Sequence, residues 1–160
     1  VAFVQQVLDE TGCRAEWLTM ELTESLMVGE PENIRRAFAQ LRRMGVSVSI
    51  DDFGTGYSNL RYLETFPISE IKIDRCFVRD AAHSVASRVV VETVVKLGAA
   101  LDIHIVAEGI ETESERALMR ALGCSVGQGF LFAAPMEECK FLKLYEQARA
   151  LREAQDEAGT

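Results

Sequence analysis

Two kinds of segment alternate along this chain, and their order constrains the fold more than any other feature of the sequence. Short runs rich in β-branched residues predict strands at residues 17–21, 46–51, 71–74, 103–107 and 127–132. Longer segments with helical spacing of apolar residues lie between them, such as Ile34, Phe38 and Leu41. Strands that alternate with helices predict βα units around a parallel sheet.

The length of each unit favours a barrel. Five units in 160 residues are about 32 residues each, and eight such units would approach the ~250 residues typical of a (β/α)₈ barrel. We therefore predict an α/β fold, a (β/α)₈ TIM-like barrel of which this chain carries about the last five βα units. A doubly wound sheet is the alternative, but the sequence lacks the glycine-rich phosphate turn typical of that fold.

The two ends of the chain have different patterns. Residues 1–8 have the pattern of an amphipathic helix with no capping residue before it, and residue 1 is not Met, so we expect a piece of a longer chain. Residues 1–154 are predicted to form one portion of a domain, and residues 155–160 a frayed polar tail.

Thr112 and Glu115 have the spacing of a capping box and predict the start of a helix.

The charge of the chain restricts its partners. Seventeen basic against 25 acidic side chains give a net charge of −8, which disfavours DNA, RNA and anionic membrane surfaces. No stretch approaches about 20 apolar residues, so we expect no membrane contact from this segment and a cytoplasmic domain. The full-length protein could still be anchored through regions outside this sequence. The four scattered cysteines are predicted to be reduced and mostly buried.

Every predicted strand ends in a polar residue. These residues are Glu21, Asp51 with Asp52, Lys72, Glu108 and Gln128. In a barrel the carboxyl ends of the strands converge on one mouth, where catalytic groups lie. Four carboxylates gathered there would repel one another unless a cation neutralised them. Oxygen ligands without His or Cys favour Mg²⁺ or Mn²⁺.

The adjacent carboxylates Asp51 and Asp52 indicate two metal ions. Neighbouring residues of a strand face opposite sides, but both can turn toward the mouth where the strand gives way to a loop. Two ions about 4 Å apart activate a water and clamp the attacking and leaving oxygens of a phosphodiester. Lys72 would orient that water or stabilise charge on the phosphate.

Five motifs resemble, in order and spacing, the successive motifs of the EAL-domain family. They are Glu21–Ser25, Asp51–Gly56, Lys72–Asp74, Val106–Glu111 and Gly127–Phe130. The resemblance covers about residues 16–136 and implies a modified (β/α)₈ barrel that hydrolyses cyclic di-GMP to linear pGpG. It also implies a homodimer formed through helices beside the loop that follows Asp52.

The resemblance assigns roles to individual positions. The metal ligands, or groups that hold metal-bound water, would be Glu21, Asp51, Asp52 and Glu108, and the catalytic groups would be Lys72 and Glu108. The supporting and loop positions would be Glu24, Gly54, Thr55, Gly56, Glu111 and Gln128, with Pro135 in contact with substrate.

The sequence departs from the family pattern in two places. The Glu-Ala-Leu segment, whose Glu binds metal, and a later metal-binding Asn would lie upstream of Glu21, and this sequence has neither. We therefore expect the complete domain to be needed for activity. In addition, Ala134 stands where members commonly have a basic residue before the proline, Pro135.

An inactive EAL-like domain that serves as a cyclic di-GMP receptor or a protein-interaction module is the alternative function. All five motifs are present, which favours the enzyme because a receptor has no need for Lys72 or for paired Asp51 and Asp52. Apart from the site, we expect His104, inside a predicted strand, to be a core residue. Core positions are also expected for Phe130, Phe132 and Phe141.

Overall fold

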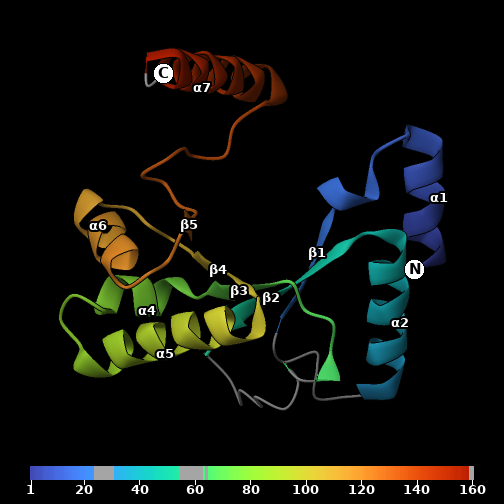
Figure 1. Cartoon of the computed structure of the whole chain (residues 1–160), viewed down its shortest axis with the longest axis horizontal. Helices are drawn as coiled ribbons and strands as arrows, with labels where there is room; N and C mark the ends of the chain where they lie inside the picture. The colour runs from blue at the N-terminus through green and yellow to red at the C-terminus, as the bar shows by residue number, and fades with distance from the viewer. Residues whose placement is uncertain (24–30, 55–62, 64, 159–160) are drawn as a thin grey trace.

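A five-stranded parallel sheet forms the centre of the computed structural model, which describes all residues except 24–30, 55–62, 64 and 159–160 (Figure 1). The strands are β1 (Thr19–Thr23), β2 (Ser47–Phe53), β3 (Glu70–Ile73), β4 (His104–Ala107) and β5 (Val126–Gly127). They lie in the order β1-β2-β3-β4-β5, so each strand pairs with the next one along the chain. This order confirms the predicted α/β partial barrel.

Helices lie before, between and after the strands. They are α1 (Ala2–Thr11), the 3₁₀ helix η1 (Ala15–Trp17), α2 (Pro31–Met44), α4 (Arg75–Asp80), α5 (Val85–Leu101), α6 (Glu113–Ala121) and α7 (Glu138–Ala158). Helix α2 packs on β2, and α5 packs on β3 and β4. Figure 1 shows α7 apart from the sheet, beyond the segment that follows β5. None of the described helices combines the length and the apolar run that crossing a bilayer requires.

The core lies between the sheet and the helices that pack on its outer face. Strand residues such as Ile50 and Ile71, at most 2% exposed, belong to one cluster with helix residues such as Phe38 and Val91. Because successive side chains of a strand alternate between the two faces, the polar residues between these apolar ones face the other way. Lys72, which lies between Ile71 and Ile73, is therefore placed on the inner face.

Two predicted strands have different bounds in the structure. Trp17 belongs to η1 and is 69% exposed, so β1 begins two residues later than predicted and Glu21 lies inside it. The strand predicted at 127–132 shrinks to Val126–Gly127. There the backbone N–H of Phe132 donates to the carbonyl of Gly129 at 3.1 Å, and this turn replaces the strand pairing.

Several residues that we expected in the core are exposed. His104 is exposed because strand alternation directs its neighbour Ile105 to the helix side and His104 to the other face. Phe130, Phe132 and Phe141 are 67%, 49% and 55% exposed, because they follow β5 at the edge of the sheet. The prediction of core positions for these four residues is wrong.

The cysteines are all free thiols, as predicted, but their burial is mixed. Cys124 is buried and Cys76 is half-buried, whereas Cys13 and Cys139 are exposed. Burial raises the pKa of the Cys124 thiol to about 11. The expectation of mostly buried thiols therefore holds for only part of the set.

Helix α6 begins with the predicted capping box. The hydroxyl of Thr112 accepts the backbone N–H of Glu115 at 3.2 Å, and the Glu115 carboxylate accepts the backbone N–H groups of Thr112 and Glu111 at 2.9 and 2.8 Å. Hydrogen bonds from these backbone groups, the one from Glu111 first, lower the pKa of Glu115. At the other end of the chain, α7 continues to Ala158, into the stretch 155–160 that was predicted to be a polar tail.

Thr112→Ala should lower the free energy of unfolding by about 1 kcal/mol, because one N–H group of the first turn loses its acceptor. Urea denaturation of the two proteins measures the difference. Thr112→Ser is the matched control, since it keeps the hydroxyl and should unfold near the native midpoint. Equal losses for Ala and Ser would contradict the role of the cap.

Candidate active site

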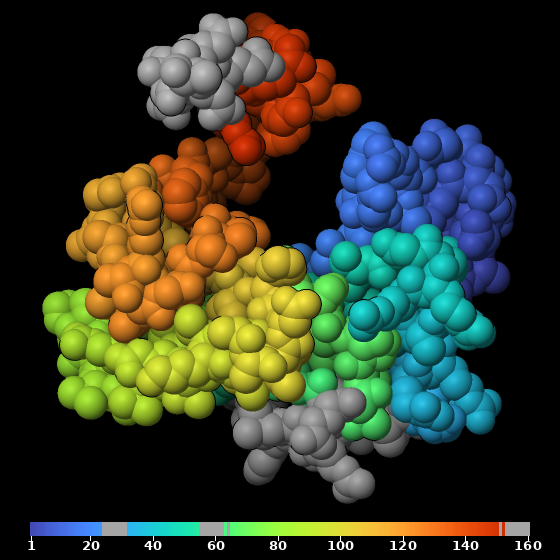
Figure 2. Space-filling view, in the orientation of Figure 1, coloured from blue at the N-terminus to red at the C-terminus, as the bar shows by residue number. Residues whose placement is uncertain are grey.

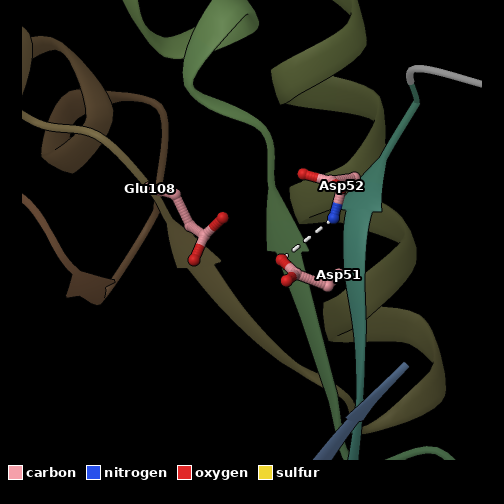
Figure 3. A group of neighbouring side chains, drawn as sticks. All are labelled: Asp51, Asp52 and Glu108. Atoms are coloured by element: carbon pink, nitrogen blue, oxygen red, sulfur yellow. Dashed lines mark hydrogen bonds between the residues drawn. The ribbon is translucent and has the colours of Figure 1, made fainter. Parts of the chain in front are cut away.

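Three carboxylates meet at the carboxyl ends of two strands. Asp51 and Asp52 come from β2, and Glu108 directly follows β4, with β3 between them (Figure 3). One carboxylate oxygen from each residue lies within 4.8 Å of the other two. All the donors are oxygen atoms, and this donor set fits a hard divalent cation such as Mg²⁺ or Mn²⁺.

An irregularity in β2 brings the two adjacent aspartates to the same side. The register between β2 and β3 shifts between Ile50 and Phe53, and Asp52 has a left-handed backbone with φ of 55°. The backbone N–H of Asp52 donates to the Asp51 carboxylate at 3.0 Å, as the dashed line in Figure 3 marks. A bulge of this kind inside the strand re-aims side chains. From the sequence we expected the strand to give way to a loop at this point, whereas both aspartates lie within β2.

Lys72 joins the carboxylates from the neighbouring strand β3. Its Nζ lies 2.7 Å from Glu108, 2.9 Å from Glu21 and 3.5 Å from Asp51, and its side chain is only 6% exposed. Burial opposes the charged form, but the hydrogen bonds to Glu108 and Glu21 outweigh it and raise the pKa of Lys72. The ammonium is therefore charged at any ordinary pH.

The site carries more negative charge than Lys72 balances. Burial, and after it the Asp51 charge, raises the pKa of Asp52 above its ordinary value. Burial likewise raises the pKa of Glu108, even though Lys72 acts in the opposite direction. A bound divalent cation would stabilise the ionised form of both groups, so the electrostatics agree with the donor set.

Two cavities border these groups. One of about 430 Å³ is lined by Asp52, Glu108, Glu111 and Gln128 among other residues. The other, of about 440 Å³ on the inner face of the sheet, is lined by Glu21, Lys72 and again Gln128. Gln128 lines both cavities and thus lies where they meet.

The remaining predicted positions lie farther from the carboxylates or outside the described residues. Pro135 is exposed and lines a different hollow, which it shares with Gln128 and Phe130. Gly54 has φ of 96°, and a Cβ there would lie 2.9 Å from the ring of Phe77, so glycine fits this close approach. Outside the described residues lie Glu24, Thr55 and Gly56.

Two residues at the mouth have roles that we did not predict from the sequence. Asp74 was predicted to end a strand, but it caps α4, where its carboxylate accepts the backbone N–H of Cys76 at 2.9 Å. Burial acts against ionisation of Asp74, yet the hydrogen bonds from Cys76 prevail and lower its pKa. Arg75 brings a positive charge to the cavity that Asp52 and Glu108 line. Arg75 directly follows the strand predicted at residues 71–74, and this position could have indicated that it lies at the mouth.

Comparisons with known proteins identify the family to which this chain is similar. The family described as EAL domain matches residues 1–135. The chain is 46% identical over 119 residues to the bifunctional diguanylate cyclase/cyclic di-GMP phosphodiesterase MucR of Pseudomonas aeruginosa, an alignment that covers 74% of this chain and 17% of MucR.

Solved structures agree with the sequence comparison. The c-di-GMP complex of the PaMucR phosphodiesterase superposes with a TM-score of 0.82 at 41% identity, over 86% of this chain and 56% of that one. The manganese and cyclic di-GMP complex of Klebsiella pneumoniae BlrP1 superposes with a TM-score of 0.79 at 35% identity, over 84% and 34%. The chain thus spans 56% of the solved PaMucR chain and about a sixth of curated MucR.

Proposed function

Because this chain belongs to the EAL domain family, we propose that its site serves the metal-dependent hydrolysis of cyclic di-GMP to linear pGpG. The observation that carries the proposal is the cluster of Asp51, Asp52 and Glu108, whose oxygens lie within 4.8 Å of one another beside a buried lysine. Relatives named as cyclic di-GMP phosphodiesterases, and a relative solved in complex with c-di-GMP, support the substrate.

The proposed metal is Mg²⁺ or Mn²⁺, two ions per complete site. Asp51, Asp52 and Glu108 would hold them, together with Glu21 from β1. The ions, when bound, supply an activated water and neutralise charge on the phosphate oxygens. The manganese complex of BlrP1 with its nucleotide supports a divalent ion in this fold.

The protein's own side chains have separate tasks in this proposal. Lys72 presents a charged ammonium 2.7 Å from Glu108, where it would orient the attacking water and stabilise negative charge at the phosphate. Glu108 would hold the metal next to that water. Arg75 places a second positive group on the neighbouring cavity. Together these cations offset locally the net charge of −8, which otherwise repels an anionic substrate.

The outer positions belong to the same proposal. Gln128 would support the site from the junction of the two cavities, and Glu111 from the rim of one of them. Pro135 would contact the nucleotide from the hollow that it shares with Gln128 and Phe130. A homodimer through the barrel and a cytoplasmic location of the domain complete the proposal, and analytical ultracentrifugation of the purified protein tests the dimer.

Chromatography of cyclic di-GMP incubated with the purified protein and Mn²⁺ or Mg²⁺ tests the activity. We expect pGpG to accumulate only when metal is present. If the nucleotide stays intact and binds equally well in the presence of a chelator, the protein is a receptor instead. The assay should compare these 160 residues with the longest protein that contains them, because we propose that the complete domain is needed.

A further inference from the structure

Lys72 lies where a cation could hold the acidic side chains together without any metal. We propose that Lys72 is an internal counter-cation, which keeps the carboxylate cluster assembled before metal binds and competes with metal for it. The competition rests on the metal site of the proposed function. The assembling role concerns the metal-free protein and can be tested separately.

The contacts of Lys72 join side chains from neighbouring strands on the inner face of the sheet. Its Nζ reaches Glu21 on β1, Asp51 on β2 and Glu108 after β4, while Lys72 itself stands on β3. One buried ammonium on β3 thus contacts side chains from β1, from β2 and from the residue that directly follows β4. Because all three carboxylates lie within 3.5 Å of the same Nζ atom, they are close to one another. Without a positive charge at this point they would repel one another.

The donor opposite Glu21 on the neighbouring strand β2 does not replace the ammonium. Ser49 is the register partner of Glu21 on β2, yet its hydroxyl is fully buried and has no hydrogen-bond partner in the described part of the chain. Among the described residues, the ion pair with Lys72 at 2.9 Å is the contact that compensates the charge of Glu21. Carboxylates that lose such a partner stay close together only at a cost in stability.

The same contacts make Lys72 a competitor of a metal ion. Lys72 donates to an oxygen of Glu108 and lies 3.5 Å from an oxygen of Asp51, and both carboxylates belong to the candidate metal cluster. A divalent ion placed there would share these oxygens with the ammonium and would be repelled by it across a few ångströms. Lys72 therefore lowers the metal affinity while it prepares the ligands.

Thermal unfolding in the presence of a chelator tests the assembling role. Lys72→Met keeps an unbranched side chain that is one atom shorter and removes the charge, and we expect it to lower Tm by about 5 °C or more. Lys96→Met is the matched control, because Lys96 is exposed on α5 and its loss changes the net charge equally. It should shift Tm by less than about 2 °C. Equal shifts for the two variants would overturn the proposal.

A double variant protects this test against a general failure of the Lys72→Met protein to fold. Glu21→Gln removes one of the carboxylates that Lys72 compensates, at its 2.9 Å contact. If repulsion causes the loss, the Lys72→Met, Glu21→Gln protein should regain part of the lost Tm. If the double variant is no more stable than Lys72→Met, the counter-cation role is wrong.

Calorimetric titration with Mn²⁺ alone, without nucleotide, tests the competition. We expect Lys72→Met to bind Mn²⁺ at least about tenfold more tightly than the native protein, and Lys96→Met to bind it as the native protein does. Unchanged or weaker binding by Lys72→Met overturns the competition. A third outcome is that the native protein binds no Mn²⁺ while Lys72→Met still has a lower Tm in chelator. In that case the proposed metal site is wrong and the assembling role of Lys72 is kept.

Discussion

Asp51→Asn should lower the rate of cyclic di-GMP hydrolysis about 10³-fold at saturating Mn²⁺. The amide oxygen of Asn can still accept the backbone N–H of residue 52, as the carboxylate does at 3.0 Å, so the bulge in β2 should persist. The negative charge that a metal requires is lost beside Asp52 and Glu108. A loss of about 4 kcal/mol in metal-assisted stabilisation of the transition state corresponds to this factor.

Asp102→Asn is the control for this substitution. Asp102 is exposed at the end of α5 with φ of 56°, a backbone conformation that Asn adopts as readily as Asp. Its activity should equal that of the native protein. The Tm of both variants shows whether the fold is intact. Near-normal turnover by Asp51→Asn with an intact fold would show that Asp51 is not part of the metal site.

Local patterns were sufficient to predict the architecture. The strand runs and the helical spacing between them gave the five βα units, because hydrophobic periodicity follows directly from local backbone geometry. The capping box at Thr112 was predictable for the same reason, since both hydrogen bonds join residues within one helical turn. The polar residues predicted at the ends of the second and fourth strands, Asp51 with Asp52 and Glu108, likewise lie at the carboxyl ends of β2 and β4.

The detailed geometry of the site depends on lateral pairing, which local patterns do not contain. The bulge at Asp51 and Asp52 exists only relative to the register of β3. Lys72 lies inside its strand and contacts Glu21, which lies inside another, so their meeting depends on how two separate strands align. The motif order indicated that these residues belong together, but it did not indicate that one ammonium contacts three carboxylates.

The burial of the aromatic residues after β5 was predicted wrongly. An apolar side chain is buried only if a neighbouring element covers it, and the sequence around Phe130 and Phe132 does not show which element that is. Figure 2 shows an open hollow between the segments after β5 and the N-terminal helix α1. The two residues are therefore exposed at the edge of the sheet although their pattern resembles that of a core strand.

Removal of divalent metal should abolish turnover, with a loss of at least about 10³-fold. Burial, and after it the charge of Asp51, raises the pKa of both Asp52 and Glu108, so their ionised forms are poorly stabilised, and a phosphodiester brings further negative charge to them. Without metal the substrate would meet this negative charge with only Lys72 and Arg75 to offset it. Dialysis against a chelator, followed by the pGpG assay, measures the loss.

Restoration by metal distinguishes loss of the ion from damage to the protein. Mn²⁺ or Mg²⁺ added after dialysis should return native activity to the native protein and to Asp102→Asn, whereas Asp51→Asn should stay inactive because it lacks the charge that holds the ion. Activity that persists in chelator would contradict a metal mechanism. It would leave Lys72, the buried cation next to Glu108, as the group that stabilises the phosphate charge.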